Sequence, residues 1–115
     1  MPPDVFKLLV DMRSAAAGIS QFVAGRTFAD FKSDLMVKLA VEREFEIIGE
    51  ALGRLLKADA ATAEKITEYR RIIGFRNVLI HGYDTVSDDV TWKIIEEKLP
   101  ILVRELDAII AKPAP

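Results

Sequence analysis

The sequence has 115 residues, of which half are hydrophobic and 30% are charged, and its formal net charge is −2. These values predict one globular domain over residues 1–111, followed by a frayed tail over residues 112–115, and they exclude a disordered chain. The slightly acidic charge argues against a surface that is basic throughout and coats nucleic acid, but it allows a local basic groove.

The first half of the chain predicts two long helices, because apolar residues recur there at steps of three and four. We expect Asp4 to cap the first helix and Gly25 to end it. A second apolar stripe begins at Phe28 and predicts a helix to about Lys57, with room for an irregular first turn. Gly49 inside this helix costs about 1 kcal/mol relative to alanine, which close approach of another helix would explain.

The second half predicts a third helical region and a last helix. Asp59 is expected to cap the third region, which continues to His81, and Gly82 is expected to end it in a left-handed conformation. We expect Ser87 to cap the last helix and Pro100 to kink it in the preceding turn. No alternating pattern indicates a strand, so the fold class is expected to be all-α, an antiparallel bundle of four to five helices.

The stretch RNVLIHGY, residues 76–83, places polar side chains in an apolar run that otherwise predicts a buried helix. On a helical wheel Arg76 falls near the middle of the apolar arc, where a guanidinium needs a carboxylate or a phosphate as its partner. A structural ion pair to Glu46 or Glu50 is one explanation. These two carboxylates are interpreted as part of a solvated helix face and not as a metal site.

The same stretch also holds a set of groups that could act on a phosphodiester. Asn77 and His81 are four residues apart, so their side chains can meet on one flank of the helix, beside Arg76. A histidine here can simply stabilise the helix end, and Tyr83 can be a partly buried turn residue. Together, an arginine, an amide and a histidine offer a phosphate clamp, an orienting group and a proton carrier. This combination favours metal-free phosphodiester cleavage.

The chain has no cysteine and a single histidine, which excludes disulfides and leaves no recognisable zinc pattern. We therefore expect no metal and no cofactor. No signal segment is seen, and no apolar stretch reaches the ~18 residues of a membrane span. A cytoplasmic protein without membrane contact is expected.

The motif resembles that of the HepT-like toxins in the HEPN ribonuclease superfamily. The family's arginine, four-residue gap, histidine, one residue and tyrosine match Arg76, His81 and Tyr83, and its polar residue after the arginine matches Asn77. The resemblance extends over most of the chain and includes the segment REFEIIGEA at residues 43–51, Trp92 and Pro100. The chain departs from the family at Tyr69, where the family commonly has Trp.

The resemblance implies a metal-independent endoribonuclease, the toxin of a type VII-like toxin–antitoxin pair whose antitoxin is an MNT-type nucleotidyltransferase. In such enzymes the ribose 2′-hydroxyl of the RNA substrate attacks the neighbouring phosphate. Arg76 would neutralise the phosphorane, His81 would move protons, Asn77 would orient His81 or the phosphate, and Tyr83 would accept AMP from the partner. Since the chain has one histidine, we expect a two-fold homodimer that joins two His81 side chains in a composite site.

Two other functions remain open from the sequence. The first is a non-catalytic helical dimer that binds a nucleotidyltransferase and uses Arg76 and Asn77 only to fix its interface. The second is a nucleotide-binding helper of that enzyme, although no Gly-rich phosphate loop is present to bind ATP.

Overall fold

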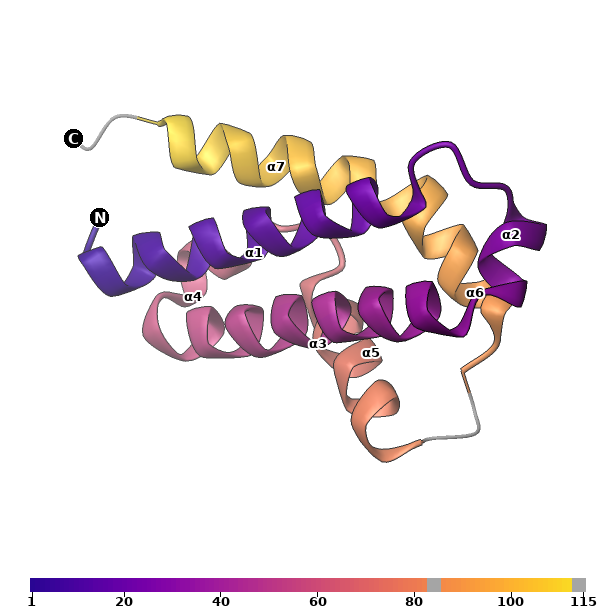
Figure 1. The fold of residues 1–115 in the computed structure, drawn as a ribbon. Coiled ribbons are helices and arrows are strands. Elements are labelled where there is room, and N and C mark those ends of the chain that lie inside the picture. The colour runs from indigo at the N-terminus through magenta and orange to yellow at the C-terminus, as the bar shows by residue number, and fades with distance from the viewer. Residues whose placement is uncertain (83–85, 113–115) are drawn as a thin grey trace.

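The computed structural model describes residues 1–82 and 86–112, and within these ranges the chain forms helices and no strand (Figure 1). The all-α prediction is confirmed. The four long helices are α1 (Pro3–Val23), α3 (Leu35–Ala58), α5 (Tyr69–His81) and α7 (Leu99–Ala111). The shorter elements are α2 (Phe28–Ser33), α4 (Ala60–Ala63), α6 (Asp88–Lys93) and a π-helix at Ile94–Lys98. None of the described helices has both the length and the apolar character needed to cross a membrane.

The hydrophobic core lies between α1, α3 and α7. Helix α1 packs against both of the others and runs in the opposite direction to them (Figure 1). Apolar residues spaced three and four apart put one face of each helix toward the others, and burying each such side chain contributes about 1.5–3 kcal/mol. The completely buried side chains include Leu9, Met12 and Ile19 of α1, Ile48, Leu52 and Leu55 of α3, and Leu106 of α7.

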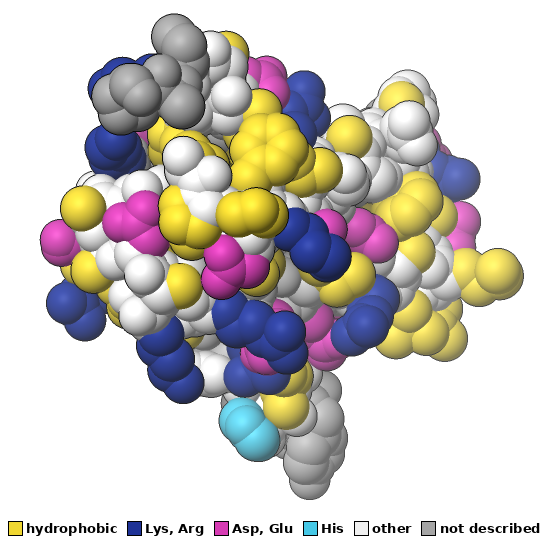
Figure 2. Space-filling view, turned by 90° about the vertical axis from the view of Figure 1, so that its left-hand side faces the viewer, with side chains coloured by type: hydrophobic (Ala, Val, Ile, Leu, Met, Phe, Trp, Pro, Cys, Tyr) yellow, Lys and Arg dark blue, Asp and Glu magenta, His cyan; other side chains and the backbone are white. Residues whose placement is uncertain are grey.

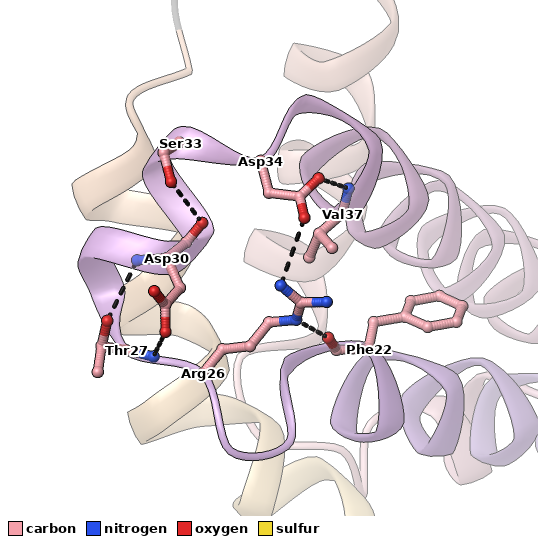
Figure 3. Close-up of polar contacts among 7 residues, drawn as sticks. All are labelled: Phe22, Arg26, Thr27, Asp30, Ser33, Asp34 and Val37. Atoms are coloured by element: carbon pink, nitrogen blue, oxygen red, sulfur yellow. Dashed lines mark hydrogen bonds and ion pairs between the residues drawn. The ribbon is translucent and has the colours of Figure 1, made fainter.

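The predicted long second helix is in fact two helices, which meet at Asp34. The backbone of Asp34 is extended (φ −111, ψ 97), so it ends α2 and begins α3. Its carboxylate accepts the Val37 N–H at 3.1 Å and pairs with Arg26 Nη1 at 3.3 Å (Figure 3). The prediction of one helix from Phe28 was wrong because the apolar stripe continues through a residue that serves as a cap.

A capping box fixes the start of α2. The Asp30 N–H donates to Thr27 Oγ1 at 3.1 Å, and the Thr27 N–H donates to the Asp30 carboxylate at 3.0 Å (Figure 3). The hydrogen bonds from Thr27 lower the pKa of Asp30. This arrangement satisfies two N–H groups that a helix start leaves without intrahelical partners.

Of the two predicted ends of α1, only the C-terminal one is confirmed. The helix begins at Pro3 with Pro2 as its N-cap, so Asp4 lies in the first turn and is not the cap that was predicted. Proline suits the first helical position because its missing N–H has no partner there anyway. Gly25 follows the end of the helix with φ +74, which confirms it as the stop.

The region between residues 59 and 81 is not one continuous helix. Asp59 caps α4 as predicted, because its carboxylate accepts the Thr62 N–H at 3.2 Å. Helix α4 ends after four residues, and Glu68 then takes a left-handed conformation (φ 56, ψ 35) directly before α5. Gly82 ends α5 with φ −112, so the predicted left-handed conformation is wrong at Gly82. The positive φ falls at Glu68, where no glycine marks it in the sequence.

The last helix changes its winding just before Pro100. Ser87 caps α6 as predicted, since its hydroxyl accepts the Val90 N–H at 3.2 Å. A π-helix follows, and the Leu99 N–H reaches back to the Ile94 carbonyl. Because Pro100 has no N–H to donate to the preceding turn, the wider π turn absorbs the break. The predicted kink is confirmed in this form, and α6 and α7 lie at an angle (Figure 1).

Candidate functional site

Helix α5 carries Arg76, Asn77 and His81 and packs against α3 (Figure 1), and Gly49 of α3 lies where the two helices meet. A Cβ atom added to Gly49 would lie 2.2 Å from Arg76 Cβ and 2.8 Å from Arg76 Cγ. The close helix approach expected from this glycine is therefore confirmed. Beside the crossing, the Phe45 and Phe75 rings pack edge to face with centroids 5.3 Å apart. The crossing fixes where the stem of Arg76 emerges.

Arg76 is held by two polar contacts. Its Nη2 lies 2.9 Å from Glu50 Oε2, and its Nη1–H donates to Asn77 Oδ1 at 3.3 Å. Its Nε is buried, and no described residue accepts its hydrogen. Of the two carboxylates considered from the sequence, the structure selects Glu50, whereas Glu46 pairs with Arg43 at 3.6 Å. The guanidinium is thus anchored on one side and retains N–H groups for a further acceptor.

The expectation that Arg76 lies inside a buried arc needs correction. Helix α5 contains no fully buried residue, and the Arg76 side chain is 29% exposed. Val78 and Ile80 are each 42% exposed, although both belong to the apolar run. The helical wheel assumes that an apolar arc is covered, whereas the last turns of α5 project from the rest of the fold (Figure 1).

A groove of about 340 Å³ lies beside Arg76, between α1, α3 and α5. Its charged lining combines three arginines with three acidic residues, so the groove is mixed in charge and not uniformly basic. On the face drawn in Figure 2, several Lys and Arg side chains lie near the histidine (cyan), with a few Asp and Glu side chains among them. The charged lining residues are Asp11, Arg43, Glu46, Glu50, Arg54 and Arg76.

Glu42 lies one helical turn before Glu46, which lines the groove. Burial raises the pKa of Glu42, and its neighbours Glu46 and Asp88 raise it further. Lys38, which pairs with Asp88 at 3.4 Å, acts in the opposite direction. Within the described ranges no group of three or more His, Asp or Glu residues is arranged to hold a metal ion.

The other predicted site residues lie at the free end of α5. Asn77 and His81 are exposed, and Asn77 binds Arg76 instead of His81. In the part of the chain that is described, the side chain of His81 makes no hydrogen bond or ion pair, and only its backbone is bonded, within α5. Tyr83 lies outside the described residues. The structure therefore joins the side chains of Arg76 and Asn77, and leaves His81 on the same helix without a side-chain hydrogen bond to either.

Sequence reasoning named Glu50 only as one of two possible structural partners of Arg76, and it gave no place at the site to Arg54, whose Nε lies 3.1 Å from Glu50 Oε1. Their spacing of four residues predicts an attractive pair on a helix surface, which is a common surface feature. Leu8 and Asp11 of α1 also line the groove, and nothing in their local sequence indicates this. Only the packing of α1 on α3 brings them there.

Comparison with known proteins places the chain in a family. A family model described as "Ribonuclease HepT-like" matches residues 12–109. A protein of Methanocaldococcus jannaschii named "Putative RNase MJ1380" is 30% identical over 106 residues, which cover 92% of this chain and 96% of that protein. A protein of Thermococcus cleftensis named "Probable ribonuclease HepT" is 34% identical over 94 residues, or 82% of this chain and 84% of that protein.

No solved structure matches the chain significantly. The family assignment depends instead on the model match, which spans most of the chain including α5, and on the relatives of similar length. The chain belongs to the HepT-like ribonuclease family of HEPN proteins.

Proposed function

We propose that the chain is a metal-independent endoribonuclease that acts in the cytoplasm as the toxin of a type VII-like toxin–antitoxin pair. The observation that carries this proposal is the anchored guanidinium of Arg76, which lies at a groove on the helix that ends in His81. A fixed cation beside open space suits an RNA phosphate, and the names of the relatives refer to RNase activity.

In the proposed reaction the ribose 2′-oxygen forms a bond to the adjacent phosphorus, and the bond from phosphorus to the 5′-oxygen breaks. One His81 takes the proton of the 2′-hydroxyl, and a second His81 gives a proton to the leaving 5′-oxygen. Arg76 neutralises the charge that builds up on the phosphorane oxygens. Asn77 orients the guanidinium, since its side-chain oxygen accepts a hydrogen bond from it. The products are a 2′,3′-cyclic phosphate and a 5′-hydroxyl.

Two histidines at one site require two chains, because each chain has one. The proposed homodimer is supported by the exposed apolar side chains of α5, Val78 and Ile80, next to the exposed His81. A second copy that covers this end of α5 about a two-fold axis would bury the apolar residues and bring the two His81 rings together.

The experiment that tests the proposed function uses the purified chain. Light scattering at micromolar concentration should give twice the 12.8 kDa mass of one chain. Single-stranded RNA should be cleaved with EDTA present, and the products should carry 2′,3′-cyclic phosphate ends. A monomer that cleaves RNA would overturn the composite site, whereas activity that EDTA abolishes would overturn the metal-free mechanism.

The proposed antitoxin is an MNT-type nucleotidyltransferase that transfers AMP from Mg-ATP to the Tyr83 hydroxyl. The AMP phosphate would stand near Arg76, compete with the RNA phosphate and repel the strand. We expect Tyr83→Phe to remain a nuclease and to resist neutralisation when the partner is co-expressed. Mass spectrometry of the wild-type chain should find AMP on Tyr83. Neutralisation of an unmodified wild-type chain would show that the antitoxin acts by binding alone.

A second candidate is a non-catalytic helical dimer that serves as a binding partner of a nucleotidyltransferase. The observation that favours it is that Glu50 and Asn77 already engage Arg76, as they would in a purely structural role. A structure of the dimer distinguishes the two candidates. An open cleft with both His81 rings supports the nuclease, and a filled, dry interface supports the binding module.

A further inference from the structure

Glu50 is the carboxylate that joins two of the three arginines that line the groove, Arg54 of α3 and Arg76 of α5. Its Oε2 lies 2.9 Å from Arg76 Nη2, and its Oε1 lies 3.1 Å from Arg54 Nε. Each carboxylate oxygen therefore binds one guanidinium. Arg54 is one helical turn after Glu50, so α3 itself supplies both the carboxylate and the group that holds it from the other side.

The contact between Glu50 and Arg76 joins α3 and α5 beside Gly49, where the two helices approach closely. Gly49 lets α5 approach until Arg76 Cβ occupies the space of a side chain on α3. The next residue, Glu50, then meets the far end of the same arginine side chain. Arg76 is thereby restrained at its stem by Gly49, at Nη2 by Glu50 and at Nη1 by Asn77. An unrestrained arginine would have to lose much of its rotamer freedom on binding a phosphate.

The charges directly around Arg76 are positive in sum, although the whole charged lining of the groove, three arginines and three acidic residues, sums to zero. Glu50 contributes −1 and the two arginines contribute +2, so the three side chains together carry +1. Arg54 offsets part of the negative charge that Glu50 would otherwise place beside Arg76. The carboxylate thus fixes the guanidinium without cancelling the positive charge of the cluster.

We propose that Glu50 is a positioning residue for Arg76, which it holds in the orientation that stabilises charge during RNA cleavage. This inference rests on the proposed function. A preorganised cation acts most strongly in the transition state, because it needs no rearrangement as charge develops. Glu50 itself touches neither the RNA nor the reacting atoms, and its effect passes through Arg76.

The test compares Glu50→Ala and Glu50→Asp with the wild-type chain. Alanine removes the carboxylate, and aspartate keeps the charge but shortens the side chain so that it no longer spans to Arg76. We expect kcat to fall by about 10- to 100-fold in both variants, the range that small misplacements of a catalytic group produce. KM should not rise in Glu50→Ala, because the loss of a negative charge favours RNA binding.

The matched control is Glu68→Ala. Glu68 also joins two cations, Arg71 at 3.3 Å and Lys98 at 3.2 Å, and its side chain is 35% exposed compared with 45% for Glu50. It has no contact with Arg76 among the described ion pairs. We expect kcat of Glu68→Ala to equal that of the wild type. An equal fall in both alanine variants would mean that any two-cation bridge serves the fold, and it would overturn the proposal.

A readout that needs no activity separates this inference from the proposed function. The buried Nε–H of Arg76 should give a 15N–1H NMR signal that exchanges slowly with water in the wild-type chain, and Arg76→Lys identifies it by its loss. In both Glu50 variants the exchange should become fast. Slow exchange in those variants, or wild-type kcat in either, would overturn the positioning role. If the wild-type chain cleaves no RNA while the signal still depends on Glu50, the nuclease function fails and the anchoring of Arg76 stands.

Discussion

Replacement of Arg76 or of His81 with alanine is expected to lower the rate of RNA cleavage by a factor of about 10² or more, while the chain stays folded. Arg76 would supply the cation that stabilises the phosphorane, and His81 would carry protons. Neither side chain supports the core, since Arg76 is at the groove and His81 is exposed. Arg76→Ala leaves Glu50 paired with Arg54, so no carboxylate becomes isolated.

Initial rates on single-stranded RNA, together with thermal melting followed by circular dichroism, measure the two effects separately. Cells that express either variant should also be free of any growth arrest that the wild-type chain causes. Arg71→Ala is a control on α5, because it removes an exposed cation that pairs with Glu68 and does not line the groove. Wild-type rates in either Arg76→Ala or His81→Ala would remove that residue from the mechanism.

Gly49→Ala is expected to destabilise the fold by about 1–3 kcal/mol, although alanine is the better helix former. The new methyl group would lie 2.2 Å from Arg76 Cβ, so α5 would have to move away from α3. Because the same movement displaces the guanidinium from Glu50, RNA cleavage should fall as well. The free energy of unfolding in urea measures the first effect.

Gly53→Ala provides the control for this prediction. Gly53 lies one turn after Gly49 on α3, and nothing lies within 4 Å of a Cβ atom added there. We therefore expect Gly53→Ala to raise the free energy of unfolding by about 0.5–1 kcal/mol, through helix propensity alone. If Gly49→Ala stabilises the chain to the same extent, the helices do not approach as closely as the structure indicates.

The features of the fold that depend on residues close together in the sequence could be predicted. Asp59 and Ser87 cap helices because their side chains reach N–H groups three residues later. The helix breaks at Asp34 and Glu68 could not be found in this way. At Asp34 the apolar stripe continues across the break, and at Glu68 a residue without glycine's freedom takes a positive φ. Both breaks lie beside contacts with distant segments, since Phe31 of α2 packs on Trp92 and Glu68 pairs with Lys98.

The candidate site could likewise be predicted in part from residues that are close together in the sequence. The spacing of Arg76, Asn77 and His81 identifies the motif without any structure. The choice of Glu50 over Glu46 depends on the level at which α5 crosses α3, which periodicity does not reveal. The part of the groove that α1 forms likewise comes only from packing. The catalytic roles of Arg76, Asn77 and His81 and the modification of Tyr83 remain predictions.

The π-helix before Pro100 also rotates the apolar face of α7 relative to that of α6. A π turn holds about one residue more than an α turn, so side chains on its two sides are out of phase by roughly 100° relative to an unbroken helix. Before it, the Trp92 ring packs on Phe31 of α2, with centroids 5.2 Å apart. After it, Leu102 and Leu106 face the core. One amphipathic stripe in the sequence thus packs in two directions, toward α2 before the π-helix and toward the core after it. The additional residue of the π turn produces the rotation between the two.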